Sequence, residues 1–318
     1  MIGRFLLQRV VQMIVTLLVL VIATFLALRM APGGPAGVLL GPDQQTPERV
    51  AQVETRLGLD RSLPEQLVRW SGSVLHGDLG TSYFYRAPAL DVVMERLPAT
   101  LVLGAGAMLL ALVIGIPAGV WAAARRGGVI DRLVRGSAVV MMSTPTFWLG
   151  IGLIFVFSSW MGVLPSSGSG AMRGASTFDE RLRHLALPLT TMALPTAAIF
   201  ALYTRSALAE VLDADFMRTA RAMGLRERQL LWGHALRNAA IPVVMQIGLT
   251  LPHVLEGSII VETVFSWPGI GQLTASSVGR RDYPILLTIT LFVGIGVLLS
   301  SLLSDLAQRM IDPRVELT

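Results

Sequence analysis

Long apolar segments alternate with polar segments along the whole chain. The apolar segments run over residues 10–30, 97–123, 136–160, 186–203, 239–261 and 284–306. A helix needs about 20 apolar residues to cross the hydrocarbon core of a membrane, and the segments come close to that length. The pattern therefore predicts an all-α membrane protein with six transmembrane helices.

The first apolar segment has an alternative interpretation as a cleaved signal peptide. Its apolar run is longer than the roughly 7–15 residues of a signal-peptide core, and no small-residue cleavage site of the A-x-A kind follows it. We therefore expect a retained first span.

The longest polar segment, residues 31–96, carries signals for short helices. Thr46-Pro47 is typical of an N-cap followed by proline in the first turn, and Gly58 is placed to end that helix. Ser62-Leu63-Pro64 predicts the start of a second helix, and the Gly77–Gly80 stretch predicts a turn. We expect a small folded helical element outside the membrane.

Composition excludes several kinds of chemistry. The chain is 53% hydrophobic and 15% charged, which is typical of membrane proteins. It has no cysteine, so disulfides, thiol nucleophiles and cysteine metal sites are excluded. All 26 basic residues are arginine, so the lysine of a standard P-loop is absent and nucleotide hydrolysis is not expected within this chain.

Candidate metal and catalytic residues are sparse. The histidines, at positions 76, 184, 234 and 253, have no metal-ligand spacing, and the Ser/Gly run at 166–170 resembles a nucleophile elbow only superficially. We expect no cofactor, no metal and no enzyme activity.

Arginines set the expected orientation. They concentrate in the N-terminal tail, in the loop at 124–135 and around the loop at 215–238, and the short loops between these carry fewer. Basic residues favour the cytoplasmic side, so both termini and the loop at 215–238 are predicted to be cytoplasmic and residues 31–96 to face outward. Because membrane topology accounts for the high basic content, we expect no nucleic-acid partner.

The segment 215–242 lies between two spans and organises the chain. A short helix is predicted from Asp215 to Met223, with Phe216, Ala220 and Met223 on one face and Gly224 ending it. A second helix is predicted over 226–238. Helices held at the membrane surface by two spans would move both spans when displaced, so we expect a partner that supplies work to grip them.

Glu256 is an ionisable side chain deep in the fifth span, near His253. Intramembrane carboxylates usually face a cavity or a partner. Two interpretations remain open: Glu256 and His253 line a solute path that favours a cationic group, or they make a structural contact with each other or with a neighbouring helix. A proton-driven transporter normally carries several such buried groups, and this chain has one pair and no evident inverted repeat. The energy source is therefore expected outside this polypeptide.

Several motifs resemble those of ATP-binding-cassette (ABC) importer permeases, in the form found in the dipeptide/oligopeptide subfamily. They cover nearly the whole chain and are, in order, LGLD at 57–60, GDLGTS at 77–82, LPSSG at 164–168, RTARAMG at 218–224, HALRNAAIP at 234–242, ETVFSWPGIG at 262–271 and RDYP at 281–284. The segment at 218–224 stands where many importers have the cytoplasmic EAA loop. The long outward segment is similar to that of the first of the two permeases that such systems pair.

The resemblance implies a type I ABC importer fold with a helical extracytoplasmic insertion after the first span. Residues 1–96 would hold the first span and that insertion, 97–309 the permease domain and 310–318 a cytoplasmic tail. It also implies partners: a homologous second permease, two ATPase subunits that bind the loops and an extracytoplasmic solute-binding protein. The chain would be a multi-pass protein of the cell membrane in contact with its lipid.

The resemblance also assigns roles to the residues of the loop. Those expected to take part in coupling to the ATPase are Glu210, Asp215, Phe216, Met217, Arg218, Ala220, Arg221, Met223 and Gly224. Phe216, Met217, Ala220 and Met223 would pack in the socket, and Glu210, Arg218 and Arg221 would make polar contacts. The alternative for the arginines is attraction to anionic lipid.

The expected activity is import of dipeptides or oligopeptides. The same scaffold serves nickel chelates and glutathione, and a secondary transporter working alone or a membrane enzyme remain as competing classes. Arg226 stands where the subfamily often has serine, Met223 where it often has lysine, and Glu256 where it often has a small residue.

Overall fold

The computed structural model describes residues 2–31, 34–41, 45–169, 177–226 and 229–311. Within these ranges the regular structure is helical, and the chain divides into two compact units. The first comprises residues 1–100 and 268–298, and the second comprises residues 101–267 and 299–318. Helices α5 (Ala89–Ala124) and α13 (Tyr283–Ile311) contribute residues to both units.

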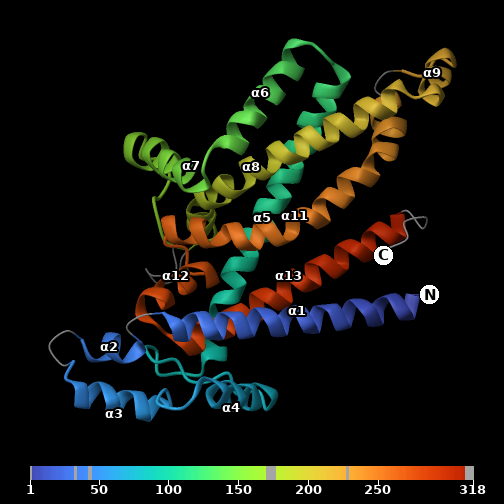
Figure 1. Ribbon diagram of the computed structural model, residues 1–318. Coiled ribbons are helices and arrows are strands. Elements are labelled where there is room, and N and C mark those ends of the chain that lie inside the picture. Colours follow the sequence, from blue (N-terminus) through green and yellow to red (C-terminus); the bar gives the residue numbers. More distant parts are fainter. Residues whose placement is uncertain (1, 32–33, 42–44, 170–176, 227–228, 312–318) are drawn as a thin grey trace. The chain divides into compact units, whose positions relative to one another are not determined.

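The first unit contains the first long helix and the extramembrane helices. These are α1 (Ile2–Met30), α2 (Pro35–Leu40), α3 (Pro47–Leu57), α4 (Leu63–Leu75) and α12 (Ile270–Arg280). Helix α2 packs on α3 and on α12, and α4 contacts α1 (Figure 1). Ala89, Val93, Ile285 and Ile289 belong to its apolar core, where the start of α5 meets the start of α13.

The predicted caps of the extramembrane helices are present. The hydroxyl of Thr46 accepts a hydrogen bond from the Arg49 N–H at 3.4 Å, and Gly58 ends α3 with φ 67°. Ser62 stands at the N-cap position of α4, although its side chain makes no capping bond. Between Gly77 and Gly80, the Gly80 N–H donates to the Asp78 carboxylate at 2.9 Å. Local sequence thus places these helices correctly.

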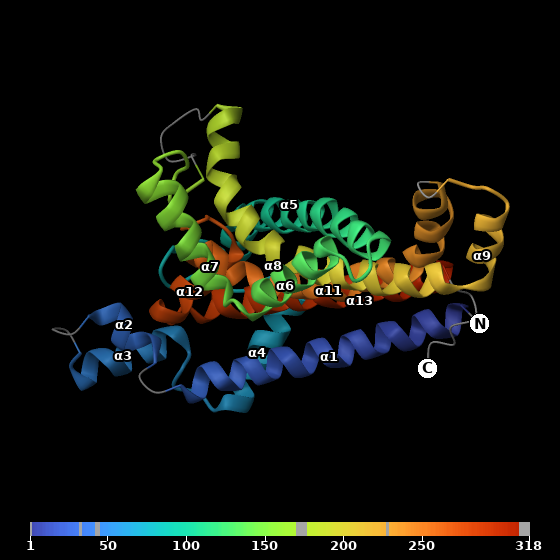
Figure 2. The ribbon, with the colours of Figure 1, turned by 90° about the horizontal axis from the view of Figure 1, so that it is seen from above.

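The second unit is built on the long helices α8 (Phe178–Asp213) and α11 (Leu236–Val264), which lie side by side (Figures 1 and 2). Helices α6 (Val129–Ser143) and α7 (Thr146–Leu153) pack against α8, and α7 continues into the π-helix η2 (Ile154–Trp160). The short helix α9 (Asp215–Ala222) follows α8, and the π-helix η4 (Leu230–Ala235) leads into α11.

Within the described ranges, four helices are long and apolar enough to cross a membrane. They cover Leu7–Met30, Ala89–Ala124, Phe178–Asp213 and Tyr283–Leu306. A fifth span results if the pair Val129–Ser143 and Thr146–Trp160, bent by 104° around Pro145, is counted as one. The prediction of six spans with cytoplasmic termini remains a prediction.

Three boundaries differ from the expectation. The loop expected up to residue 185 ends earlier, because Thr177 and Glu180 form a capping box that starts α8 at Phe178. The loop expected over 262–283 contains α12. The second helix of the organising segment does not stop at Asn238, since η4 runs into α11 without a break.

Candidate functional site

Helix α9 is a separate short helix between two turns. Ala214 has an extended backbone conformation (φ −70°, ψ 150°), which ends α8 and separates it from α9. At the other end Gly224 has φ 81°, in the left-handed region that favours glycine, and its N–H donates to the Arg221 carbonyl oxygen at 2.9 Å. The helix predicted from Asp215 to Met223 and ended by Gly224 is thus present to within one residue.

Met217 anchors α9 to the rest of the second unit. Its side chain is fully buried in a cluster that also contains Val120 of α5, Leu208 of α8 and Leu230 of η4. Ala220 is half-buried and packs against the same cluster. Truncating a methionine in such a site costs about 2–5 kcal/mol, so this one contact holds the helix firmly.

The side of α9 that carries Phe216 and Met223 is open to solvent. Phe216 is 49% exposed and Met223 is 77% exposed, and both lie outside the candidate membrane spans. Arg218 and Arg221 are exposed beside them. Exposed apolar groups bordered by charge are typical of a protein–protein contact surface.

Charges along α9 match its helix dipole. Asp215 lies in the first turn and Arg221 in the last, which is the favourable order. The Arg218 Nη1 donates to the Asp215 carboxylate at 3.3 Å, with both side chains largely exposed. Glu210, on the last turns of α8, is also exposed.

The structure therefore divides the predicted coupling residues into two groups. The exposed group contains Glu210, Asp215, Phe216, Arg218, Arg221, Met223 and Gly224. The inner group contains Met217, expected from the sequence to enter a partner's socket, and in part Ala220. Met217 packs inward, since its side chain lies about 100° around the helix from that of Phe216 and therefore on a different face.

A buried ion pair joins α8 to the start of α6. The Arg205 Nε donates to Asp131 Oδ1 at 2.5 Å, and the Arg205 Nη2 donates to Oδ2 at 2.9 Å. Asp131 also accepts from the Gly127 N–H at 2.9 Å, and Arg135 lies at 3.5 Å. Sequence reasoning missed this pair; the signal was that Asp131 is the single acid in an arginine-rich loop.

Two glycines bring α5 and α8 into close contact. A Cβ atom on Gly115 would lie 2.5 Å from the Ala197 carbonyl oxygen, and one on Gly119 would lie 2.6 Å from the Ala201 carbonyl oxygen. The small-xxx-small pattern at 115–119 predicts such close approach, and the structure confirms it. Because these two glycines have no side chain, the backbone of α5 packs directly on backbone and side-chain atoms of α8.

Part of the predicted site, the side chains of His253 and Glu256, lies outside the described residues. The same holds for Glu227, Arg228 and the side chain of His234 in the segment 215–242. The backbone of His253 and Glu256 is in α11. Their suggested place on a solute path remains a prediction.

Two family models together match nearly the whole chain. One, described as the binding-protein-dependent transport system inner membrane component, matches residues 115–317. Another, for the N-terminal part of such membrane components, matches residues 1–104. The chain belongs to this family and is a multi-pass protein of the inner membrane.

Curated relatives match over nearly the full length. The probable peptide ABC transporter permease protein y4tP of Sinorhizobium fredii is 38% identical over 98% of this chain and 99% of its own. The oligopeptide transport system permease protein AppB of Bacillus subtilis is 35% identical over 99% of both chains. The dipeptide transport system permease protein DppB of Escherichia coli is 36% identical over 98% of both.

Solved structures show the same fold. An inward-facing structure of the MetNI methionine ABC transporter superposes with a TM-score of 0.58 at 20% identity, over 70% of this chain and 97% of the other. The expected likeness to importer permeases is confirmed at the level of the fold.

Proposed function

We propose that this chain is a permease subunit of an ATP-driven importer of short peptides, and that separate ATPase subunits drive it through the exposed face of α9. Three relatives that match it end to end carry names of peptide permeases. The chain has no lysine for a P-loop, which fits an ATPase on another polypeptide. Its further proposed partners are a homologous second permease and an extracytoplasmic solute-binding protein.

The observation that carries the proposal is the two-sided character of α9. Met217 on one side is fully buried in its own unit, and Phe216 and Met223 on the other side are exposed. A partner that grips the exposed side moves α9 together with the residues around Met217, which come from α5, α8 and η4. A displacement caused by nucleotide binding would then reach the long helices α8 and α11.

Individual residues take distinct roles in this proposal. Phe216 and Met223 supply apolar contact, and Arg218, Arg221, Asp215 and Glu210 supply polar contacts at the rim. Met217 and Ala220 hold the helix in place, and Gly224 provides the turn behind it. Opening and closing of the long helices would give alternating access to a solute path, on which Glu256 and His253 are candidate residues.

The test replaces the exposed apolar groups by charge. The assembled transporter is reconstituted in liposomes with its binding protein, and uptake of a labelled dipeptide is measured together with ATP hydrolysis. In the double variant Phe216→Asp, Met223→Asp we expect ATP-dependent uptake to fall by at least about tenfold, because charged groups cannot enter an apolar socket. The free energy of unfolding of the variant, measured by thermal unfolding, should stay within about 0.5 kcal/mol of the wild-type value, since both sites are exposed.

Leu75→Asp is the matched control, because Leu75 is an 86% exposed apolar residue of the extramembrane helix α4. It should leave coupled uptake unchanged. Full coupled uptake by the Phe216/Met223 variant would overturn the role of α9. Uptake by this chain alone, without ATPase subunits, would instead favour a secondary transporter.

Ala220 is a poorer place for the charge. Its side chain packs partly against the cluster around Met217, so a carboxylate there would disturb the chain's own fold as well as the contact surface.

A further inference from the structure

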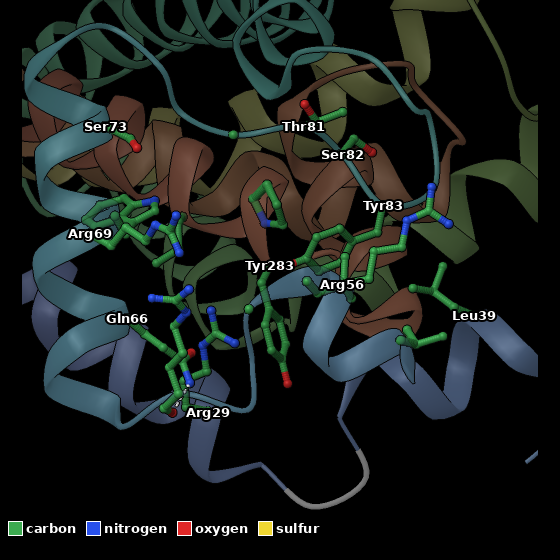
Figure 3. A pocket seen from close by; sticks show the side chains of 18 of the residues that line it. Arg29, Leu39, Arg56, Gln66, Arg69, Ser73, Thr81, Ser82, Tyr83 and Tyr283 are labelled. Atoms are coloured by element: carbon green, nitrogen blue, oxygen red, sulfur yellow. Dashed lines mark hydrogen bonds between the residues drawn. The ribbon is translucent and has the colours of Figure 1, made fainter. Parts of the chain in front are cut away.

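The first unit contains a cavity of about 990 Å³ between the extramembrane helices and the start of α13 (Figure 3). Its walls come from α2, α3, the turn after α3, α4, the segment 79–86 and the start of α13, and Arg29 from the end of α1 reaches into it. This is at the upper end of the volumes, about 300–1,000 Å³, that small-molecule sites have in proteins. The proposed function makes no use of this cavity.

Charge in the cavity wall is strongly unbalanced. Five arginines line it and one aspartate, Asp60, does so; the arginines are Arg29, Arg56, Arg61, Arg69 and Arg86. Arg61 pairs with Glu65 at 2.5 Å on the surface. Within the described ranges, no carboxylate lies within ion-pair distance of the other four. Positive charge gathered in a concave site attracts and concentrates anions.

Two buried polar groups in the wall lack hydrogen-bond partners in the described structure. Gln66 is 7% exposed; its Nε2 donates to the Leu59 and Arg61 carbonyl oxygens at 3.1 and 2.8 Å, and its Oε1 accepts nothing. The Trp70 Nε1–H likewise donates to nothing. A buried group left without a partner costs about 1–3 kcal/mol, so both are placed to bind a ligand that supplies one donor and one acceptor.

One wall of the cavity is fixed by a buried carboxylate. Asp282 accepts hydrogen bonds from the Ser82 hydroxyl at 2.5 Å, the Tyr83 N–H at 3.1 Å and the Phe84 N–H at 3.2 Å. Burial raises the pKa of Tyr83 to about 12, so its hydroxyl remains protonated. The Arg29 guanidinium lies 5.0 Å from the centre of the Tyr283 ring, which holds it at the cavity edge. The site is therefore built before any ligand arrives.

We propose that this cavity binds a short peptide by its free terminal carboxylate. The identification of the solute as a peptide rests on the proposed function. The guanidinium groups receive the carboxylate, since planar guanidinium matches it with two parallel hydrogen bonds. A peptide N–H or ammonium group supplies the donor that Gln66 Oε1 lacks. The rings of Trp70 and Tyr83 supply apolar surface for a side chain of the peptide.

An anionic phospholipid headgroup is the competing occupant, because Arg29 stands at the end of a candidate span. The phosphodiester group itself has acceptors for the arginines but no donor for Gln66 Oε1, and in phosphatidylglycerol a donor comes only from the glycerol hydroxyls beyond the phosphate. The cavity combines guanidinium groups with an acceptor that has no donor, Gln66 Oε1, and this combination favours a peptide as the occupant. On the predicted topology the cavity faces the side from which solute arrives.

The test measures binding to the full chain in nanodiscs of uncharged phosphatidylcholine. The probes are labelled alanyl-alanine and trialanine with a free carboxylate, and the same peptides as terminal amides. We expect the free acids to bind at least about tenfold more tightly than the amides, because the amide loses a charge-assisted hydrogen bond. Arg56→Gln with Arg69→Gln should remove that preference.

Arg49→Gln is the matched control, because Arg49 is an exposed arginine on the same helix α3 as Arg56 and does not line the cavity. It should bind both forms as the wild type does. Gln66→Glu adds a negative charge at the acceptor and should weaken binding of the free acids at least about tenfold.

Three outcomes would overturn the proposal: no binding of either free acid at millimolar concentration, equal binding of acids and amides, or a preference that survives the Arg56/Arg69 substitutions. Binding of phosphatidylglycerol, measured in nanodiscs that contain this lipid, that is lost in the Arg56/Arg69 variant while no peptide binds would assign the cavity to lipid instead. ATP-driven uptake by the assembled transporter is a separate measurement. The cavity can therefore fail as a peptide site while the proposed function stands.

Discussion

Arg205 and Asp131 form a two-bonded ion pair in which the carboxylate is 1% exposed and the guanidinium 17% exposed. The other ion pairs recorded between described residues join exposed or half-exposed groups, apart from the further approach of Arg135 to the same Asp131. The pair ties the first turn of α6 to α8, two turns before the α8 helix ends and α9 begins. It fixes the helix from which α9 extends.

Removing one partner of this pair should destabilise the chain. In Arg205→Ala the Asp131 carboxylate stays buried with its main partner gone, which costs about 3–5 kcal/mol in comparable buried pairs. Thermal unfolding of the chain in detergent would measure the loss. Arg126→Ala removes the exposed pair with Asp213 (2.7 Å) and should change stability by less than about 0.5 kcal/mol. Equal effects of the two substitutions would contradict the assigned importance of the buried pair.

Met217→Ala should loosen α9 without unfolding the spans. The lost side chain leaves a cavity between α5, α8 and η4, and the expected cost is about 2–5 kcal/mol. Amide hydrogen exchange should rise over 215–222 and stay unchanged in α3. Met223→Ala is the control, because this side chain is 77% exposed and its removal should leave exchange as it is. Unchanged exchange in Met217→Ala would mean that other contacts hold the helix.

A Gly→Ala substitution at the seam between α5 and α8 should lower the stability of the chain, whereas the same substitution at an open helix position should not. Gly119→Ala forces the new Cβ against the Ala201 carbonyl oxygen and the Thr204 side chain, with an expected cost of about 1–3 kcal/mol. Gly136→Ala on α6 meets no atom within 4 Å and should be neutral or stabilising by up to about 1 kcal/mol, since alanine favours the helix. Stability measured for both variants in the same detergent would check the prediction, and a neutral Gly119→Ala would contradict it.

Local chemistry made much of the fold predictable. The caps at Thr46, Gly58 and Gly224 depend on one or two neighbouring residues, and the sequence placed all three correctly. The apolar runs located the long helices, although not their ends. Helix α8 begins eight residues before the expected start at 186, because the capping box of Thr177 and Glu180 outweighs the polar composition of its first turns.

Features that depend on distant residues were not predictable in this way. Helix α12 has small and polar residues without a strong apolar period, and part of its support comes from a hydrogen bond that the Ile270 N–H donates to the Thr100 hydroxyl at 2.8 Å. Arg205 and Asp131 are 74 residues apart. The inward direction of Met217 also depends on Leu208 and Leu230, which only the folded chain brings around it.

Because Met217 is already buried in the chain's own apolar cluster, α9 is ordered before any partner arrives. A flexible eight-residue segment would lose about 1–2 kcal/mol of conformational freedom per residue on becoming helical at the moment of contact. Here that entropy is given up once, during folding, so association at this surface needs no coupled disorder-to-order transition. A preformed recognition helix of this kind favours repeated, rapid engagement and release over a single slow capture.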